Sequence, residues 1–146
     1  MIASLVFLDS LRFKFTNAPE TQVIFGKLND WAASLGVDGL FAQTGLFSQY
    51  TIGTAELIAS TLLIIGILPA FRRLQALGAL IAVAVMTGAI SFHLFTPLGI
   101  DPNNDGGGLF FMACVVWAGS LTMLAIRRKE LFGLLGDLRK ALVQAR

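Results

Sequence analysis

Three long apolar stretches constrain this chain more than any other feature of its sequence. They cover residues 49–69, 74–96 and 107–126, and Glu56 is the only Asp, Glu, Lys or Arg within them. A helix needs about 20 mostly apolar residues to cross the hydrocarbon core of a bilayer. Charged residues make up only 14% of the chain, whereas soluble domains contain about 25%. Both observations predict an integral membrane protein.

The N-terminal residues 1–15 are also apolar, but this run is short, and Asp9 and Arg12 interrupt it. A secretory signal peptide begins with basic residues and ends at a small-residue cleavage site, and this segment has neither. We expect a first span here, either a short one or one that starts upstream of Met1. Together with the three long stretches, it predicts a transmembrane bundle of four helices.

The basic residues in the connections predict the orientation of these spans. The connection after the first span carries one basic residue, Lys27, and residues 97–106 carry none. Cytoplasmic loops are richer in Lys and Arg than outer loops. We therefore expect a multi-pass protein of the bacterial cytoplasmic (inner) membrane with both termini in the cytoplasm. The residues that mark the cytoplasmic side are Arg72, Arg73, Arg127, Arg128 and Lys129.

Residues 19–47 predict an amphipathic helical segment on the outer surface. Pro19 suits the first turn of a helix, and Asn17 suits the cap before it. An apolar stripe with helical spacing follows, and Gly36 ends it. The segment serves either as a lid over the bundle or as a packed cap without a function of its own. The stripe consists of Ile24, Leu28, Trp31 and Leu35.

Residues 127–146 predict a second amphipathic helix, a tail on the cytoplasmic side. Leucines recur along it at helical spacing, and Arg139, Lys140 and Arg146 flank them. A basic amphipathic helix binds the surface of an anionic membrane leaflet. We expect the tail to lie against the inner leaflet, and a role in binding a partner protein stays open. The leucines are Leu131, Leu135, Leu138 and Leu142.

Ionisable residues inside the spans point most directly to function, because hydrocarbon makes them costly unless they are paired or functional. At 1.5 Å per residue, Glu56 lies about 9 Å and His93 about 6 Å below the outer boundary. Arg12 and Lys14 lie near the outer end of span one, in the same layer. Asp9 and Arg12 are three residues apart and can pair on one helix face. We expect Glu56 to turn inward toward Arg12 or Lys14, with His93 nearby.

Three interpretations of this polar layer stay open. It is a buried ion-pair network that fixes the helix register, a binding site for a polar headgroup, a quinone carbonyl or a small anion, or a site where Glu56 or His93 transfers protons. As a ligand-binding set, Glu56 and His93 contact the head of the ligand, Arg12 and Lys14 supply positive charge, and Asp9 pairs with Arg12. No haem pair, carboxylate-bridged di-iron pattern or flavin fingerprint occurs in the sequence. We therefore expect neither haem nor a metal.

The connection before the last span begins like a calcium-binding EF-hand loop. Asp101, Asn103, Asp105 and Gly106 read D-x-N-x-D-G. The twelfth position of such a loop requires Glu, and here it is Met112, inside a predicted span. We therefore expect a tight outer turn in which Asp105 caps the last span.

Charge and cysteine content exclude two further classes of function. The formal net charge is +2, and no stretch forms the basic stripe that binds phosphates, so we expect no nucleic-acid partner. The single cysteine, Cys114, excludes an internal disulfide, and without a C-x-x-C motif, thiol redox chemistry on the chain itself is not expected.

Three parts of the sequence form an ordered set: "FLDSLRFKFTNAPETQVIF", Glu56 within "GTAELIASTLLIIGILP", and "GAISFHLFTPLGIDPNNDGGGLFF". Together they resemble the DoxX-like group of small bacterial membrane proteins, over nearly the whole chain. The resemblance implies a four-helix bundle of the cytoplasmic membrane, and Lys14, Glu56 and His93 match positions characteristic of the group. Some members are the small subunit of a thiosulfate:quinone oxidoreductase, and others are linked to redox or oxidative-stress complexes. With one cysteine, this chain carries no implied thiosulfate chemistry.

The sequence thus predicts an all-α integral membrane protein, a four-helix transmembrane bundle with an outer amphipathic segment and a cytoplasmic tail. The favoured function is binding of a quinone or lipid-like ligand at the outer polar site, as a subunit of a membrane redox complex. The alternative is a non-enzymatic accessory or assembly subunit whose polar cluster is structural. Expected partners are membrane lipids and either other membrane subunits or further copies of the chain. An open cavity under the 19–47 segment would favour the first function, and a closed hydrogen-bonded network the second.

Overall fold

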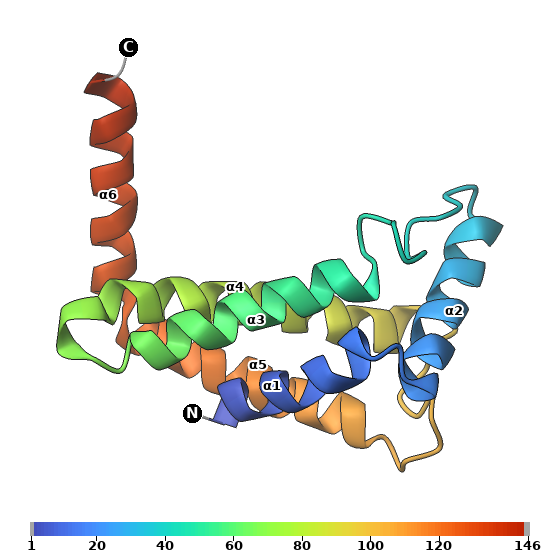
Figure 1. The fold of residues 1–146 in the computed structure, drawn as a ribbon. Coiled ribbons are helices and arrows are strands. Elements are labelled where there is room, and N and C mark those ends of the chain that lie inside the picture. The colour runs from blue at the N-terminus through green and yellow to red at the C-terminus, as the bar shows by residue number, and fades with distance from the viewer. Residues whose placement is uncertain (1, 145–146) are drawn as a thin grey trace.

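In the computed structural model, the described residues 2–144 form helices joined by turns (Figure 1). The prediction of an all-helical fold is confirmed, since no strand occurs within this range. Two ends of the chain lie outside the described residues. They are Met1, at the start of the predicted first span, and residues 145–146, at the end of the predicted tail. The elements are α1 (Ile2–Phe15), α2 (Pro19–Ser34), α3 (Gln49–Ile65), the short 3-10 helix η1 (Pro69–Phe71), α4 (Arg72–Phe95), α5 (Gly108–Ile126) and α6 (Arg128–Gln144).

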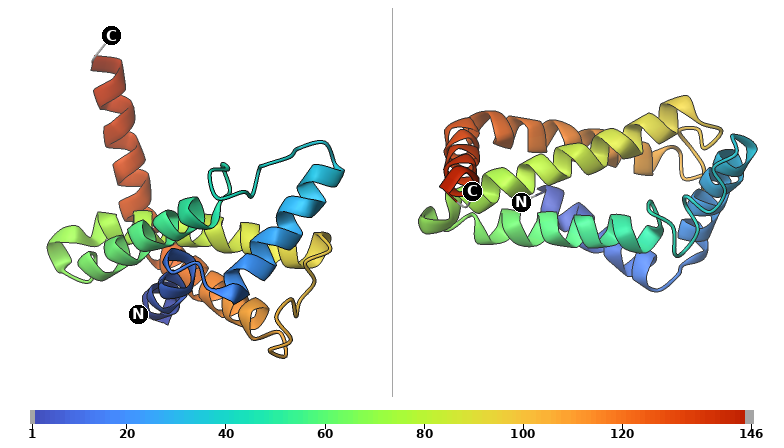
Figure 2. Two further views of the ribbon diagram at one scale, coloured as in Figure 1. Left: turned by 45° about the vertical axis from the view of Figure 1, so that its right-hand side comes forward. Right: turned by 90° about the horizontal axis from the view of Figure 1, so that it is seen from above.

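Four helices, α1, α3, α4 and α5, run side by side along the molecule (Figures 1 and 2). α4 packs against both α3 and α5, and α1 packs mainly against α3. Small residues bring α3 and α4 close together, and Ala59, Ala79 and Ala82 are fully buried. A Cβ on Gly78 would lie 2.9 Å from the backbone oxygen of Ala59. Only glycine therefore permits the two helices to approach so closely at this point.

Two helices are long and apolar enough to cross a membrane. They span Pro69–Phe95, which joins η1 to α4, and Gly108–Ile126. α3 is apolar but has 17 residues, and α1 has 14. α3 ends at Ile65 rather than at the predicted residue 69, and Gly66 begins the turn to α4. A Cβ on Gly66 would lie 2.3 Å from the Cβ of Gln75, so the turn is too tight for a side chain.

α2 lies across one end of the bundle as a cap (Figure 1). The prediction of a helix within residues 19–47 is confirmed for Pro19–Ser34, whereas residues 35–48 form a series of turns. Apolar residues of α2 pack against the turns that follow it and against the turn after α4, so the cap has a small core of its own. This core contains Leu28, Ala32, Phe41 and Leu98, all buried.

The prediction that Asn17 caps α2 is wrong. Ala18 occupies the N-cap position, and no side chain caps this end of the helix. Asn17 has a φ of 60°, in the left-handed region that Asn tolerates better than most residues. This conformation turns its side chain toward glutamine side chains of the cap and of α3.

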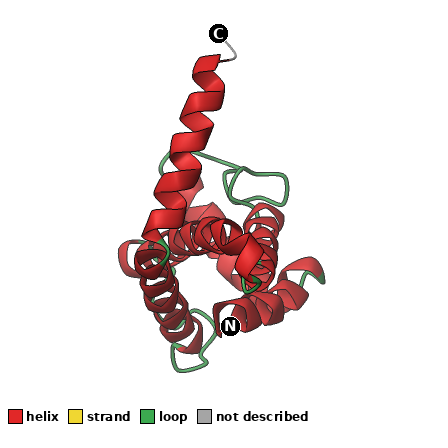
Figure 3. Cartoon of the chain, turned by 90° about the vertical axis from the view of Figure 1, so that its left-hand side faces the viewer, coloured by secondary structure: helices red, strands yellow, loops and turns green. Residues whose placement is uncertain are grey.

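α6 points away from the bundle at the end opposite α2 (Figures 1 and 3). Its base is held by an ion pair of 2.6 Å between Arg73 and Asp137, and Arg127 donates to the Gln75 side chain at 3.0 Å. The predicted amphipathic tail is therefore a helix, but its stripe has no partner within residues 2–144. Three of its leucines, Leu135, Leu138 and Leu142, are 49%, 57% and 64% exposed.

Candidate functional site

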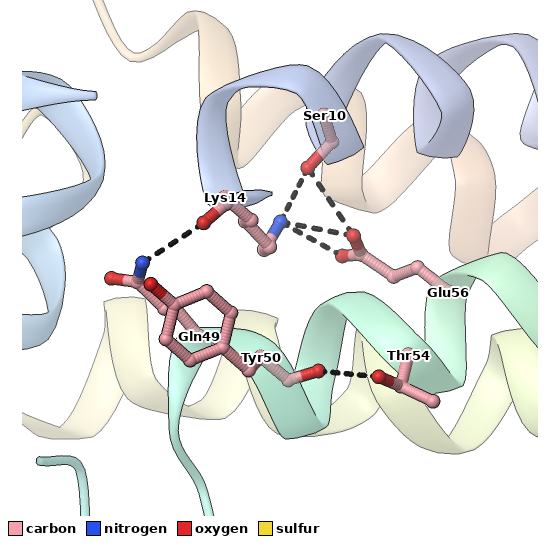
Figure 4. A network of polar contacts seen from close by, with 6 residues as sticks. All are labelled: Ser10, Lys14, Gln49, Tyr50, Thr54 and Glu56. Atoms are coloured by element: carbon pink, nitrogen blue, oxygen red, sulfur yellow. Dashed lines mark hydrogen bonds and ion pairs between the residues drawn. The ribbon is translucent and has the colours of Figure 1, made fainter. Parts of the chain in front are cut away.

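A buried ion pair joins α1 to α3 near the end of the bundle that α2 covers (Figure 4). Nζ of Lys14 lies 3.0 Å from Oε2 and 3.1 Å from Oε1 of Glu56, and the two side chains are only 14% and 4% exposed. The hydroxyl of Ser10 donates to Oε2 at 3.3 Å and accepts from Lys14. The prediction that Glu56 turns inward toward Arg12 or Lys14 is confirmed, and its partner is Lys14.

Local sequence explains why these three groups meet. Ser10 and Lys14 are four residues apart on α1 and therefore share one face. Gly53 lies one turn before Glu56 on the facing side of α3. A Cβ there would lie 3.3 Å from the ring of Phe15 and 3.5 Å from Cδ of Lys14. The glycine thus leaves room for the Lys14 stem to reach Glu56.

Asp9 and Arg12 form a second ion pair on α1, but it does not join this cluster. Their atoms Oδ1 and Nε lie 3.2 Å apart, and the side chains are 64% and 69% exposed. Arg12 also lies over the ring of Phe13, 4.6 Å from its centre. The predicted local pair is confirmed. Arg12 is not a partner of Glu56, because positions 9 and 12 face away from the side of α1 that carries Lys14.

His93 is buried in a different environment. Its Nδ1 lies 2.6 Å from the backbone oxygen of Gly99, and its ring packs edge-on against Phe110. A carbonyl can only accept, so Nδ1 carries a proton. Within residues 2–144, no hydrogen bond or ion pair joins His93 to Glu56 or Lys14. His93 therefore stabilises the turn between α4 and α5 and is not bonded to the Lys14–Glu56 pair.

That turn has the shape expected from its sequence. Oδ1 of Asp105 accepts from the backbone N–H groups of Gly107 and Gly108 at 3.0 and 3.1 Å. Gly107 occupies the N-cap position of α5 and no side chain caps this helix, so the prediction that Asp105 caps the last span is wrong, and Asp105 instead holds the turn that leads into the helix. Asp101 accepts from the N–H of Asp105 at 2.8 Å. Desolvation acts to raise the pKa of Asp101, but backbone hydrogen bonds outweigh it and hold this pKa below its usual value. Within residues 2–144, no three acidic, His or Cys side chains gather as a metal would require.

A network of side-chain amides extends the Lys14–Glu56 pair outward, and the sequence did not predict it. Gln49, at the start of α3, is 2% exposed and donates to the backbone oxygen of Lys14 at 2.9 Å (Figure 4). It also donates to Asn17 at 2.8 Å and accepts from Gln22 at 2.7 Å. Gln22 and Gln43 donate to the same Asn17 oxygen at 2.6 and 3.3 Å. The amides come from three separate segments without a common spacing, so no sequence pattern marks them.

A partly open pocket of about 180 Å³, here called the outer cavity, lies between α2, residues 41–43 and the start of α3, beside this network. Asn29 is part of its wall, and Oδ1 of Asn29 is buried without a hydrogen-bond partner. Glu56, His93, Arg12, Lys14 and Asp9 do not line it. The residues that do are Gln22, Phe25, Gly26, Asn29, Phe41, Ala42, Gln43 and Gln49.

A second cavity, of about 420 Å³, lies toward the other end of the bundle between α1, α3 and α5. Its wall is mostly apolar and includes Ile2, Leu63, Val116 and Ser120. The hydroxyl of Ser120 is buried without a partner. Like the outer cavity, this one is not lined by the Lys14–Glu56 pair.

Comparison with known proteins does not assign the chain to a family. No family model, curated protein or solved structure matches the chain. The resemblance to the DoxX-like group therefore stays a prediction from the sequence.

Proposed function

We propose that the chain is an integral protein of the bacterial cytoplasmic membrane in which α1, α3, α4 and α5 cross as a four-helix bundle. The distribution of residues on α3 supports this. Leu57, Ile58 and Ile64 are 42%, 47% and 44% exposed, while Glu56 and Ser60 are buried. Exposed apolar side chains of this kind are suited to contact with the hydrocarbon core of a bilayer. The polar side chains of α3 face the interior of the bundle, as polar residues do in membrane proteins. The basic residues of the connections support an orientation with both termini in the cytoplasm.

We further propose that the protein binds a lipid-like ligand with an uncharged polar head, such as a quinone, at the outer end of this bundle. The observation that carries this proposal is the outer cavity, with its wall of side-chain amides and two phenylalanines. Such a wall combines apolar area with a few fixed polar groups, as ligand sites do. Gln49 links the cavity to Lys14, so the buried ion pair holds one wall in position and does not itself contact the ligand.

Native mass spectrometry of the full chain in nanodiscs of bacterial polar lipids, with added duroquinone, tests this proposal. The expected result is a complex whose mass exceeds that of the chain by one ligand. Asn29→Leu should abolish the complex, whereas Asn103→Leu, outside the outer cavity, should leave it unchanged. Absence of any complex with the unsubstituted chain, or equal binding by both variants, would contradict the proposal.

A specific observation also favours a second function, that of a non-enzymatic accessory subunit in a larger membrane complex. The Lys14–Glu56–Ser10 cluster is fully hydrogen-bonded and lines neither cavity, as a structural network should. On this proposal, Glu56→Gln lowers the stability of the bundle, and a partner subunit is recovered with the unsubstituted chain after gentle solubilisation. Ligand mass and partner mass are both read in the same spectrum, so the two functions are separated directly.

A further inference from the structure

We infer that α6 lies along the surface of an anionic lipid leaflet, with its leucine stripe among the acyl chains and its basic side chains among the lipid phosphates. The inference rests on the part of the proposed function in which α1, α3, α4 and α5 cross the membrane, and it concerns the end of the bundle away from the outer cavity. The amphipathic sequence of the tail predicts only an affinity for a surface. The structure adds the direction of the helix, the side of it that stays free and the charges that stay unpaired.

α6 runs across the direction of the bundle helices. Figures 1 and 3 show it projecting to one side at the end opposite α2, directly after α5 ends at Ile126. When the bundle crosses a membrane, a helix that runs across the bundle lies in the membrane plane. Helices that bind a leaflet surface have this orientation, and their apolar face lies about 5–10 Å deep, at the boundary of headgroups and acyl chains. α6 is therefore already directed along a leaflet.

Contacts at the base of α6 leave its stripe free. Arg73, in the first turn of α4, pairs with Asp137, and a Cβ on Gly133 would lie 3.7 Å from Nη2 of the same arginine. At about 100° per residue, Gly133 and Asp137 lie about 170° and 130° around the helix from the middle of the stripe. Arg73 thus contacts the side of α6 opposite the leucines. A helix that lies between water and acyl chains requires this division into a polar side and an apolar side.

The charge at this end of the chain favours an anionic surface. Residues 127–146 contain six basic and two acidic residues, a net charge of +4, whereas residues 1–126 contain five basic and seven acidic residues, a net charge of −2. Four basic side chains of α6 are exposed and form no hydrogen bond or ion pair within residues 2–144. Their alkyl stems can cover apolar surface while their charged ends reach the phosphates. They are Arg128, Lys129, Arg139 and Lys140.

A second copy of the chain is a poorer occupant of the stripe. Two α6 helices packed through their leucines would bring together two segments of net charge +4, and like charges repel. An anionic leaflet instead supplies counter-charges, and each Lys or Arg near such a surface strengthens binding about fivefold. Of these two occupants, only the leaflet satisfies both the leucines and the basic side chains.

The test places spin labels on the two faces of α6 in the full chain, in nanodiscs that hold one copy. Cys114→Ser removes the native cysteine, Leu138→Cys labels the stripe, and Gly136→Cys labels the opposite face. Gly136 suits a label because a side chain there would meet open space. The discs consist of phosphatidylcholine alone or of an equal mixture with phosphatidylglycerol, which is anionic. Accessibility to oxygen and to a water-soluble nickel chelate reports the depth of each label.

In the anionic discs, the Leu138 label should be open to oxygen and shielded from the nickel chelate, while the Gly136 label should be open to the chelate. In phosphatidylcholine alone, the shielding of the Leu138 label should largely disappear, because the headgroups carry no net charge. Equal accessibility of the two labels, or equal shielding in both kinds of disc, would overturn the inference. Shielding that occurs only in discs with two copies would assign the stripe to a second copy and would overturn it too.

A third label separates this inference from the proposed function. Ile58→Cys lies on the exposed apolar face of α3, and its label should be shielded from the chelate in both kinds of disc if the bundle crosses the membrane. A shielded Ile58 label together with an open Leu138 label would overturn the inference and leave the proposed function standing. An Ile58 label open to the chelate would contradict the membrane-spanning bundle, and the inference with it.

A charge variant connects the shielding to the basic side chains. Arg139→Gln with Lys140→Gln should lower the ratio of shielded to open Leu138 label in the anionic discs about thirtyfold, since each basic residue contributes about fivefold. The matched control, Arg12→Gln with Lys27→Gln, removes the same charge near the other end of the bundle and should leave the ratio unchanged. An unchanged ratio in the α6 variant, or equal losses in both variants, would overturn the assignment of α6 to an anionic leaflet.

Discussion

α1 carries two ion pairs that have similar lengths and opposite surroundings. Lys14 and Glu56 are 3.0 Å apart and are 14% and 4% exposed. Asp9 and Arg12 are 3.2 Å apart and are 64% and 69% exposed. Since the distances are alike, the two pairs differ in how deeply they are buried and in which parts of the chain they connect. The buried pair joins two helices and the exposed pair lies within a single helical turn.

The comparison shows why one pair positions the candidate site and the other does not. A charge removed from water is stable only while its partner is present, so Lys14 and Glu56 fix α1 against α3. Gln49 bonds to the backbone of the same lysine, and the amide network is built outward from there. In an exposed pair, water and dissolved ions also interact with both charges, so the pair contributes little to stability. Asp9 and Arg12 therefore leave the outer cavity unaffected.

The largest expected effect is that of Glu56→Gln. It leaves the Lys14 charge buried without a counter-charge, and the loss of one partner of a buried pair costs about 3–5 kcal/mol. The free energy of unfolding, measured by reversible denaturation in mixed micelles, should fall by that amount. The matched exposed variant, Asp9→Asn, should change it by less than about 1 kcal/mol. Equal losses in the two variants would show that burial does not separate the pairs.

The double variant Lys14→Met with Glu56→Leu should recover most of this loss. Replacing both members of a buried pair by apolar side chains of similar size is often neutral, because no charge is left without a partner. The same denaturation measurement should place the double variant within about 1 kcal/mol of the unsubstituted chain. A double variant as unstable as Glu56→Gln alone would mean that the polar contacts to Ser10, and not the unpaired charge, are what α1 and α3 require.

The fold could be predicted largely from the sequence, because runs of apolar residues determine helices by length and composition. The depth of the ionisable residues followed from the 1.5 Å rise of a helix. The face on which each residue lies was also available, since positions 9 and 12 point away from positions 10 and 14 at about 100° per residue. An argument from depth in the membrane alone, without the direction of each side chain around the helix, predicts Arg12 beside Glu56. In the structure the Arg12 side chain is exposed.

Other parts of the site could not be predicted from a single sequence. His93 bonds to Gly99, and that contact depends on the path of a turn whose glycines have positive φ angles. Gln22, Gln43 and Gln49 come together only because α2 folds back across the end of the bundle. Isolated glutamines in α2, in a loop and at the start of a helix have no local signal that relates them. Their convergence is a property of tertiary structure.

Asp105 provides an intermediate case between the two pairs of α1. It is exposed, but it accepts from the backbone N–H groups of Gly107, the N-cap residue of α5, and of Gly108, the first residue of this helix. Asp105→Ala should lower the free energy of unfolding by about 1 kcal/mol, because it removes the acceptor of two backbone N–H groups. Asp105→Asn should cost much less, since the side-chain oxygen of Asn can accept the same two hydrogen bonds. Faster amide hydrogen exchange at Gly107 and Gly108 in the Ala variant alone would confirm the mechanism. Equal losses in both variants would assign the effect to the negative charge.

The smallest effect, that of Asp9→Asn, gives the sharpest test of the comparison when salt is varied. The exposed pair is screened, since the Debye length falls to about 3 Å at 1 M salt, so its contribution should vanish there. The Glu56→Gln loss should persist, because ions do not reach a pair that is 14% and 4% exposed. Asp9 is the better position for this test than Arg12, which also lies over Phe13 and would lose a contact less sensitive to salt. If high salt reduced both losses alike, water and ions would reach Glu56, and the distinction between a buried and an exposed pair on α1 would have to be abandoned.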